Sequence, residues 1–274
     1  KESTMLNKRT GLDYPILAIV SIGRKNFENM GRSLHKSGDT ISRLLESSKI
    51  NFLQAQKISR ILFGKKKKLF VIIDDSLVKK FFAEVMQGTG SFFDTKNHCN
   101  ITAFRIISCL VSDGRYSVPI GSSYLFSKEL TDLMEEPVES KEDIAKRLVV
   151  LALKLFPEAN FKVLVDGLYC TERFLRWCIT NKIDLEARMH SNRVVTYNGE
   201  KTTLKNLLNK KGIQPKGRKK TKTISVFWQN LPLEVSVVRR IDKNGDESIV
   251  FQAATYKALP REHVENYRKR WPIE

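Results

Sequence analysis

The sequence predicts an α/β protein with a mixed β-sheet flanked by helices, a helical N-terminal region and a β-rich insertion. Two observations support this fold class. Strand and helix patterns alternate in the order β-β-β-α-β-α-β between residues 69 and 188, and a second series of strand patterns follows. Apolar residues make up 41% of the 274 residues, which is enough to bury a core in one or two domains.

The first strand is expected at residues 69–73, a continuous apolar run rich in β-branched and aromatic residues. Such a run is typical of a strand that is buried on both faces. Asp74 follows the run directly and Asp75 comes next, so we expect the strand to end at Asp74.

Two more strands are expected at residues 102–111 and 116–120, because Asp113-Gly114 between them is a strong hairpin signal. A helix is expected at residues 141–155, where apolar residues recur at helical spacing.

The pattern continues with a strand that ends at a second acid. A strand is expected at residues 162–165, directly before Asp166, then a helix at 170–181 and a strand at 183–188.

A β-rich segment with a basic loop follows. Residues 201–223 carry nine Lys or Arg and no acidic residue. Strands are expected at residues 223–228, 233–240 and 248–255. The last helix is expected at residues 259–274, with Pro260 in its first turn.

Helices are expected over residues 1–65. Residues 34–47 resemble a helix-turn-helix, with Arg43 on the exposed side of the second helix. A plain helical hairpin that packs on the next domain explains the same pattern equally well.

The charge limits the classes of function. Lys and Arg number 48 against 30 Asp and Glu, which gives a net charge of +18, so we expect a polyanion as partner, most commonly nucleic acid. A basic solvated surface, or a surface for acidic lipid, gives the same charge. The longest apolar runs fall far short of a membrane span. The four cysteines form no CxxC pair, which argues against a zinc site and fits a reducing cytoplasm.

Three acids are candidate site residues: Asp74 and Asp166 at strand ends, and Glu274 on the last helix. Side chains at the carboxyl ends of strands gather at one edge of an open sheet. Carboxylates without nearby His or Cys suit a hard cation such as Mg²⁺. Each aspartate also has a structural explanation, as a helix cap or a turn residue.

The last motif, Tyr267-Arg268-Lys269-Arg270-Trp271-Pro272-Ile273-Glu274, has the spacing Y-x2-R-x3-E. It resembles the signature of DDE transposases from bacterial insertion sequences, the YREK group (insertion-sequence family four). Tyr267, Arg270 and Glu274 fall on one face of a helix.

The resemblance extends over most of the chain. Asp74-Asp75-Ser76 is similar to the first acid of the family, and Asp166-Gly167-Leu168-Tyr169 to the second. We prefer Asp74 to Asp75 as the first acid, because adjacent strand residues point to opposite faces. The family's Lys, seven residues after the Glu, would lie beyond Glu274.

This resemblance implies an RNase H-like fold and a transposase that cuts the ends of an insertion sequence and joins them to target DNA. Asp74, Asp166 and Glu274 would hold two Mg²⁺ ions, for which Mn²⁺ can substitute. Trp228 would hold a flipped base, although a core role explains it as well. The expected contacts to the DNA backbone are Tyr267, Arg270, Arg188, Arg193, Lys216, Arg218, Lys219, Lys220, Lys222 and Arg43.

The resemblance also implies a domain division and partners. We expect a DNA-binding region at residues 1–65, the first part of the catalytic core at 66–188, the insertion at 189–257 and an incomplete core helix at 258–274. The partners would be double-stranded DNA and a second copy of the chain, without a membrane or a small-molecule substrate. The location would be the bacterial cytoplasm, in association with the nucleoid.

Three rival functions stay open. A Mg²⁺-dependent nuclease of the same fold would cut DNA without joining it. A DNA-binding remnant of a transposase would bind without cutting. A basic RNA-binding module ranks last, because the sequence has no aromatic motif for stacking RNA bases.

Overall fold

The computed structural model describes residues 52–79, 89–94, 97–126, 131–132, 138–210, 213–215, 221–241 and 245–270. The chain divides into two compact units, Lys1–Gly64 and Lys65–Glu274. In the first unit the described element is helix α4 (Phe52–Phe63). The expected helix-turn-helix and Arg43 lie outside the described residues.

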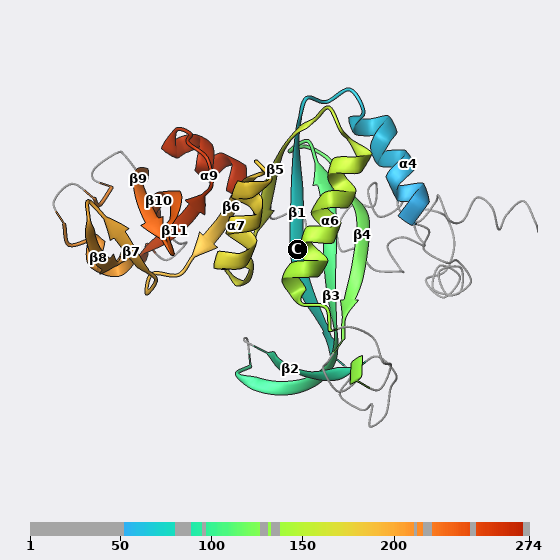
Figure 1. The fold of residues 1–274 in the computed structure, drawn as a ribbon, viewed down its shortest axis with the longest axis horizontal. Coiled ribbons are helices and arrows are strands. Elements are labelled where there is room, and N and C mark those ends of the chain that lie inside the picture. Colours follow the sequence, from blue (N-terminus) through green and yellow to red (C-terminus); the bar gives the residue numbers. More distant parts are fainter. Residues whose placement is uncertain are drawn as a thin grey trace, which may run out of the picture. The chain divides into compact units, whose positions relative to one another are not determined.

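Five strands form the centre of the second unit, side by side in the order β4-β3-β1-β5-β6 (Figure 1). Their bounds are Ser117–Leu125 for β4, Cys99–Ser112 for β3, Lys68–Lys79 for β1, Asn160–Val165 for β5 and Asp184–Met189 for β6. Strand β3 is antiparallel to β1 and β4, whereas β5 and β6 run parallel to β1. Three antiparallel strands continued by two parallel ones make up the RNase H-like sheet, which confirms the predicted fold class.

Two helices that contact each other cover one face of this sheet. Helix α6 (Lys141–Leu155) packs on β1, β3 and β4, and it has the bounds that its apolar spacing predicts. Ile73 of β1 lies opposite Cys109 of β3, whose Sγ is 3.9 Å from the Leu148 carbonyl oxygen of α6. The odd-numbered side chains of β1 therefore face α6, and the even-numbered ones face the other side. Helix α7 (Glu172–Thr180) packs on β6.

The sequence predicted that strand β1 ends at Asp74, but the strand is longer. It continues to Lys79, because the long strand β3 pairs with it as far as Lys79 opposite Ala103. The parallel neighbour β5, in contrast, stops pairing at Ile73 opposite Val165. Asp74 is therefore the first residue of β1 that has no neighbour on the β5 side. A further strand, β2 (Gly90–Asp94), which the sequence did not predict, pairs with the beginning of β3.

The segment after β6 extends the same sheet. Strand β11 pairs antiparallel with β6, and the order continues β11-β10-β9-β7-β8. The bounds are Val194–Tyr197 for β7, Glu200–Thr203 for β8, Leu204–Leu207 for helix α8, Thr221–Trp228 for β9, Leu231–Ile241 for β10 and Glu247–Ala254 for β11. The sequence predicted β9, β10 and β11, but it missed the short elements β7, β8 and α8.

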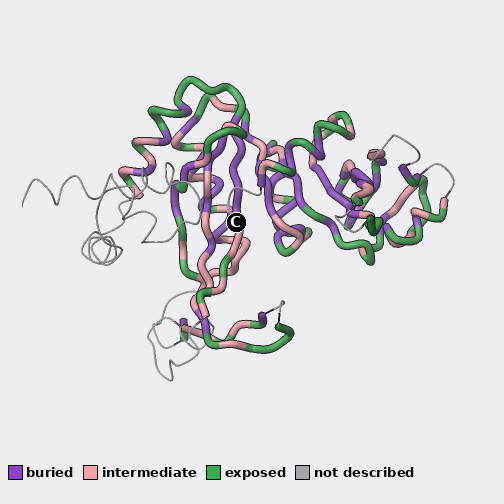
Figure 2. The backbone as a smooth tube through the Cα atoms, turned by 180° about the vertical axis from the view of Figure 1, so that it is seen from behind, coloured by how far each residue is buried: buried purple, intermediate pink, exposed green. Residues whose placement is uncertain are grey.

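Helix α9 (Pro260–Arg268) packs on β6 and on β9 to β11. Pro260 is in its first turn, as predicted, but the helix ends at Arg268 in a tight turn in which the Arg270 amide donates to the Tyr267 carbonyl oxygen. Buried residues run along the central strands of the second unit (Figure 2). No helix among the described residues is long and apolar enough to cross a membrane.

Candidate active site

Three aspartates meet where β1 loses its parallel neighbour. Asp74 and Asp75 belong to β1, and Asp166 directly follows β5. One carboxylate oxygen from each lies within 4.8 Å of the others, and they form a possible metal-binding group among the described residues. The meeting follows from the parallel register: Ile73 pairs with Val165, so the next residues of the two strands are Asp74 and Asp166. We call Asp74, Asp75 and Asp166 the acid cluster.

Asp166 has a structural role as well as a place in the cluster. Its Oδ1 accepts a hydrogen bond of 2.8 Å from the Leu168 amide and caps the short 3₁₀ helix η1 (Gly167–Tyr169). A Cβ at Gly167 would lie 3.3 Å from both the Arg188 carbonyl oxygen and His190 Nε2. The glycine therefore lets β6 and the residues after it approach Asp166 closely.

Asp75 also belongs to the cluster, and the choice of Asp74 over Asp75 as the first acid stays a prediction. The alternation of side chains holds: Asp75 lies opposite Ile107, on the α6 side, and its Oδ2 is 2.9 Å from Arg105 Nε. Its carboxylate still reaches the other two, because β5 ends at Val165 and leaves the edge of β1 open beside it.

Arg270 reaches the cluster from the turn after α9. Its Nη1 donates to Asp74 Oδ2 at 2.9 Å, and its guanidinium carbon is 5.8 Å from the centre of the Tyr267 ring. Arg270 is 8% exposed and Tyr267 3%. In the structure Arg270 therefore binds an aspartate. The predicted contacts of Tyr267 and Arg270 with DNA phosphates stay predictions.

The cluster is electrostatically costly without a cation. Burial raises the pKa of Asp74 to about 6; Arg270 opposes this rise, and the charges of Asp166 and Asp75 add to it. Burial also raises the pKa of Asp166, against the hydrogen bond from the Leu168 amide and with a further contribution from Asp75. A divalent ion would offset this repulsion, and carboxylate oxygens are the ligands that hard cations prefer. The donor set therefore fits a divalent metal.

Other predicted DNA contacts lie among the described residues. Arg188 is exposed on β6, and Lys222 is half-buried on β9. The guanidinium carbon of Arg193 is 5.1 Å from the centre of the Trp228 ring, and Trp228 is 4% exposed. A hollow of about 500 Å³ is lined by His190, Asn192, Arg193, Val194, Trp228 and Gln229. The roles of these residues stay predictions.

Several predicted site residues lie outside the described residues: Glu274, Lys216, Arg218, Lys219, Lys220 and Arg43. Arg105, which pairs with Asp75, was not among the predicted site residues. A signal was present, because Arg105 is the only charged residue of β3.

Comparison with known proteins bears on the same region. None of the curated proteins matches the chain. Among solved structures, it is similar to the NurA nuclease from Sulfolobus solfataricus, with 11% identity and a TM-score of 0.34 over 74% of this chain and 72% of that one. The family described as DDE superfamily endonuclease matches residues 4–241, a stretch that contains the whole acid cluster. With its carboxylates gathered on an RNase H-like sheet and this match over most of its length, the chain belongs to the DDE superfamily endonucleases.

Proposed function

We propose that the protein is a DNA transposase of the YREK group (insertion-sequence family four), which cuts the ends of an insertion sequence and joins them to target DNA. The observation that carries this proposal is the acid cluster with Arg270 bound to it. Arg270 lies just after α9, the helix that follows the β-rich segment. It is part of the motif Tyr267, Arg270, Glu274.

We propose that Asp74, Asp166 and Glu274 hold two Mg²⁺ ions, or Mn²⁺ in their place, and that Asp75 assists them. The bound ions would activate the attacking oxygen and stabilise charge on the phosphate. Arg270 holds one oxygen of Asp74 in the present arrangement, and on binding DNA its planar guanidinium would turn to a phosphate of the cleaved strand.

Double-stranded DNA would run past the exposed basic residues. Arg188 and His190 approach Gly167, and Arg193 lines the same hollow as His190, so both arginines are suited to the backbone next to the cut. Lys222 and the loop residues Lys216, Arg218, Lys219 and Lys220 would extend this contact without reading sequence. Trp228, beneath Arg193, would support a base turned out of the helix.

The remaining parts of the proposal concern the whole assembly. Residues 1–65, with Arg43, would recognise the terminal repeats, 66–188 and 258–274 would form the catalytic core, and 189–257 the insertion. Two copies of the chain would act on paired DNA ends, in the bacterial cytoplasm and on nucleoid DNA. Neither a membrane nor a small-molecule substrate takes part.

A second candidate is an endonuclease that cuts without joining, because the family is described as an endonuclease family. The two candidates share the metal site and the cleavage step. They differ in whether the DNA 3′-hydroxyl that is released attacks a second duplex.

Cleavage and strand transfer on DNA that carries the terminal repeats separate these functions. The informative variant is Asp166→Asn, which keeps the oxygen that caps η1 but removes the charge. Asp113→Asn is a matched control, because Asp113 also accepts backbone hydrogen bonds in a turn, from Arg115 and Tyr116, outside the acid cluster.

The proposal expects metal-dependent cut and joined products with the wild type and Asp113→Asn, and neither product with Asp166→Asn. Cut products alone would favour the endonuclease. Salt-sensitive binding without cutting in all three proteins would refute catalysis and indicate a DNA-binding remnant.

A further inference from the structure

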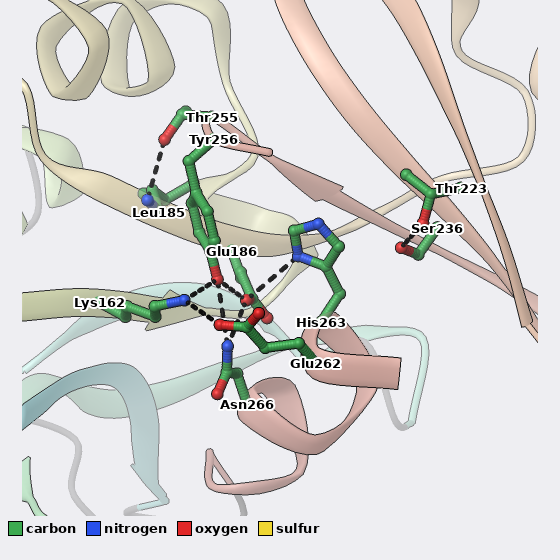
Figure 3. A network of polar contacts seen from close by, with 10 residues as sticks. All are labelled: Lys162, Leu185, Glu186, Thr223, Ser236, Thr255, Tyr256, Glu262, His263 and Asn266. Carbon is green, nitrogen blue, oxygen red and sulfur yellow. Dashed lines mark hydrogen bonds and ion pairs between the residues drawn. The ribbon is translucent and has the colours of Figure 1, made fainter. Parts of the chain in front are cut away.

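A buried glutamate lies between the sheet and α9, away from the acid cluster. Glu186 is in the middle of β6, between β5 and β11, and is 1% exposed. Its Oε1 accepts hydrogen bonds from the Tyr256 hydroxyl, from His263 Nδ1 at 3.3 Å and from Asn266 Nδ2 at 3.2 Å (Figure 3). Two of these three donors are on α9, and the third follows β11.

Lys162 of β5 strengthens the same connection. Its Nζ donates to the Tyr256 hydroxyl at 2.8 Å and to Glu262 Oε1 at 2.9 Å, so the first turn of α9 is also tied to β5 (Figure 3). Burial, and then the charge of Glu186, raise the pKa of Tyr256, which keeps its hydroxyl protonated and able to donate. Side chains of both β5 and β6 thus bind α9.

The residues that bind Glu186 share a helix face with the residues near the acid cluster. His263, Asn266, Tyr267 and Arg270 are spaced three, four and seven residues from the first, which places them on one face of α9 and its final turn. The rise from His263 to Arg270 is about 10 Å. A rotation of α9 that moved His263 away from Glu186 would therefore also move Arg270 away from Asp74.

Burying a carboxylate is costly unless several donors surround it, and an apolar residue of similar size would often stabilise such a place at least as well. Hydrogen bonds to a charged acceptor are directional, whereas apolar packing is not. The Glu186 carboxylate is satisfied only when His263 and Asn266 both face it. The group is therefore suited to fix an orientation.

We propose that Glu186 is a positioning residue that fixes the rotation of α9 on the sheet and thereby places Arg270 beside the acid cluster. The proposal rests on the proposed function in one respect, because Arg270 matters for cleavage only if the acid cluster is catalytic.

The test compares Glu186→Gln with Thr255→Val. Glutamine keeps the size of the side chain but removes the charge that holds the three donors. Thr255 is a matched control, since its hydroxyl accepts a hydrogen bond from the Leu185 amide of β6 and donates one to the Ile183 carbonyl oxygen just before β6. Two measurements are made on the whole protein: amide hydrogen exchange, and nicking, with Mg²⁺ or Mn²⁺, of a supercoiled plasmid that carries the terminal repeats.

We expect Glu186→Gln to speed amide exchange in α9 and to lower kcat for nicking about tenfold, with KM for the plasmid within about twofold of wild type. Thr255→Val should speed exchange in β6 and leave both kinetic constants within about twofold. Arg270→Lys should lose less activity in the Glu186→Gln background than in wild type, because both changes disturb the same contact.

Unchanged exchange in α9, or additive losses in the double variant, would overturn the positioning role. If the wild type nicks no plasmid with either metal, the proposed function fails, and hydrogen exchange alone decides whether Glu186 holds α9. Faster exchange confined to α9 would then still support the conclusion that Glu186 fixes α9 on the sheet.

Discussion

Asp166 affects the stability of the folded protein in two opposite ways. Its oxygen caps η1 and stabilises the turn, whereas its charge is held close to Asp74 and Asp75. A carboxyl group whose pKa is higher in the folded than in the unfolded state binds its proton more tightly when folded. The unfavourable contribution of its charge is absent below the unfolded pKa, grows in the window between the two pKa values and is complete above the folded pKa. For Asp74 that window runs from 3.8 to about 6, and for Asp166 it begins at the same ordinary value.

Asp166→Asn should therefore stabilise the protein without metal at neutral pH. The amide oxygen still caps η1 and the repulsion is removed, so we expect Tm in the presence of EDTA to rise by about 2–4 °C, or about 1 kcal/mol. The gain should vanish below about pH 4, where the carboxyl group is protonated in both states. Calorimetry at both pH values measures it.

Asp113→Asn should behave differently. Burial acts to raise the pKa of Asp113, but hydrogen bonds from the Tyr116 and Arg115 amides and the Lys66 ammonium lower it overall. Its ionised form thus favours folding, and the variant should lower Tm at neutral pH. If Asp166→Asn lowered Tm in the same way, repulsion within the acid cluster would not be the dominant effect.

Strands β1 and β3 set the geometry of the site through their register. Asp75 and Arg105 lie on one face, two places apart across the pair, so that the guanidinium neutralises an aspartate 6% exposed at its side chain. The positive charge also competes with any cation that the acid cluster binds.

Arg105→Met should destabilise the protein by about 1–3 kcal/mol, because Asp75 loses its partner. The same change should increase the affinity of the acid cluster for Mn²⁺. Urea unfolding in EDTA and a calorimetric Mn²⁺ titration measure the two effects, and Arg105→Lys is the conservative comparison. A variant that is less stable and also binds Mn²⁺ more weakly would contradict this role.

Elements with strong local signals could be predicted from the sequence. Helix α6 has a clear apolar face and a Ser140 cap, and the strand β5 is a buried run directly before Asp166. Strands β7 and β8 have only four residues each, too few for a periodic pattern. The place of Asp75 in the site could not be predicted, because it depends on where β5 stops beside β1, which is a property of the register.

At the scale of the whole molecule, the charge of +18 should govern how DNA is bound. Replacing Lys216, Arg218, Lys219 and Lys220 with Gln should reduce the dependence of log affinity on log salt by about 3–4, if each residue neutralises one phosphate. Fluorescence anisotropy over a salt series measures the slope. The reduction in slope should be equal for a terminal-repeat duplex and a scrambled one, because backbone contacts carry no sequence information. A loss confined to the repeat would show that the loop recognises bases.

The pairing of β11 with β6 also governs what can be removed from this protein. Over Glu186 to Met189 the insertion supplies the outer hydrogen-bonding partner of β6, so the last parallel strand of the core is not an edge strand. A chain from which the insertion was deleted would expose the unpaired amides and carbonyls of β6, a template to which other chains add by strand pairing. Strand β11 therefore shields the edge of β6 from such pairing, and the strands after β6 are part of the same sheet rather than an appended module.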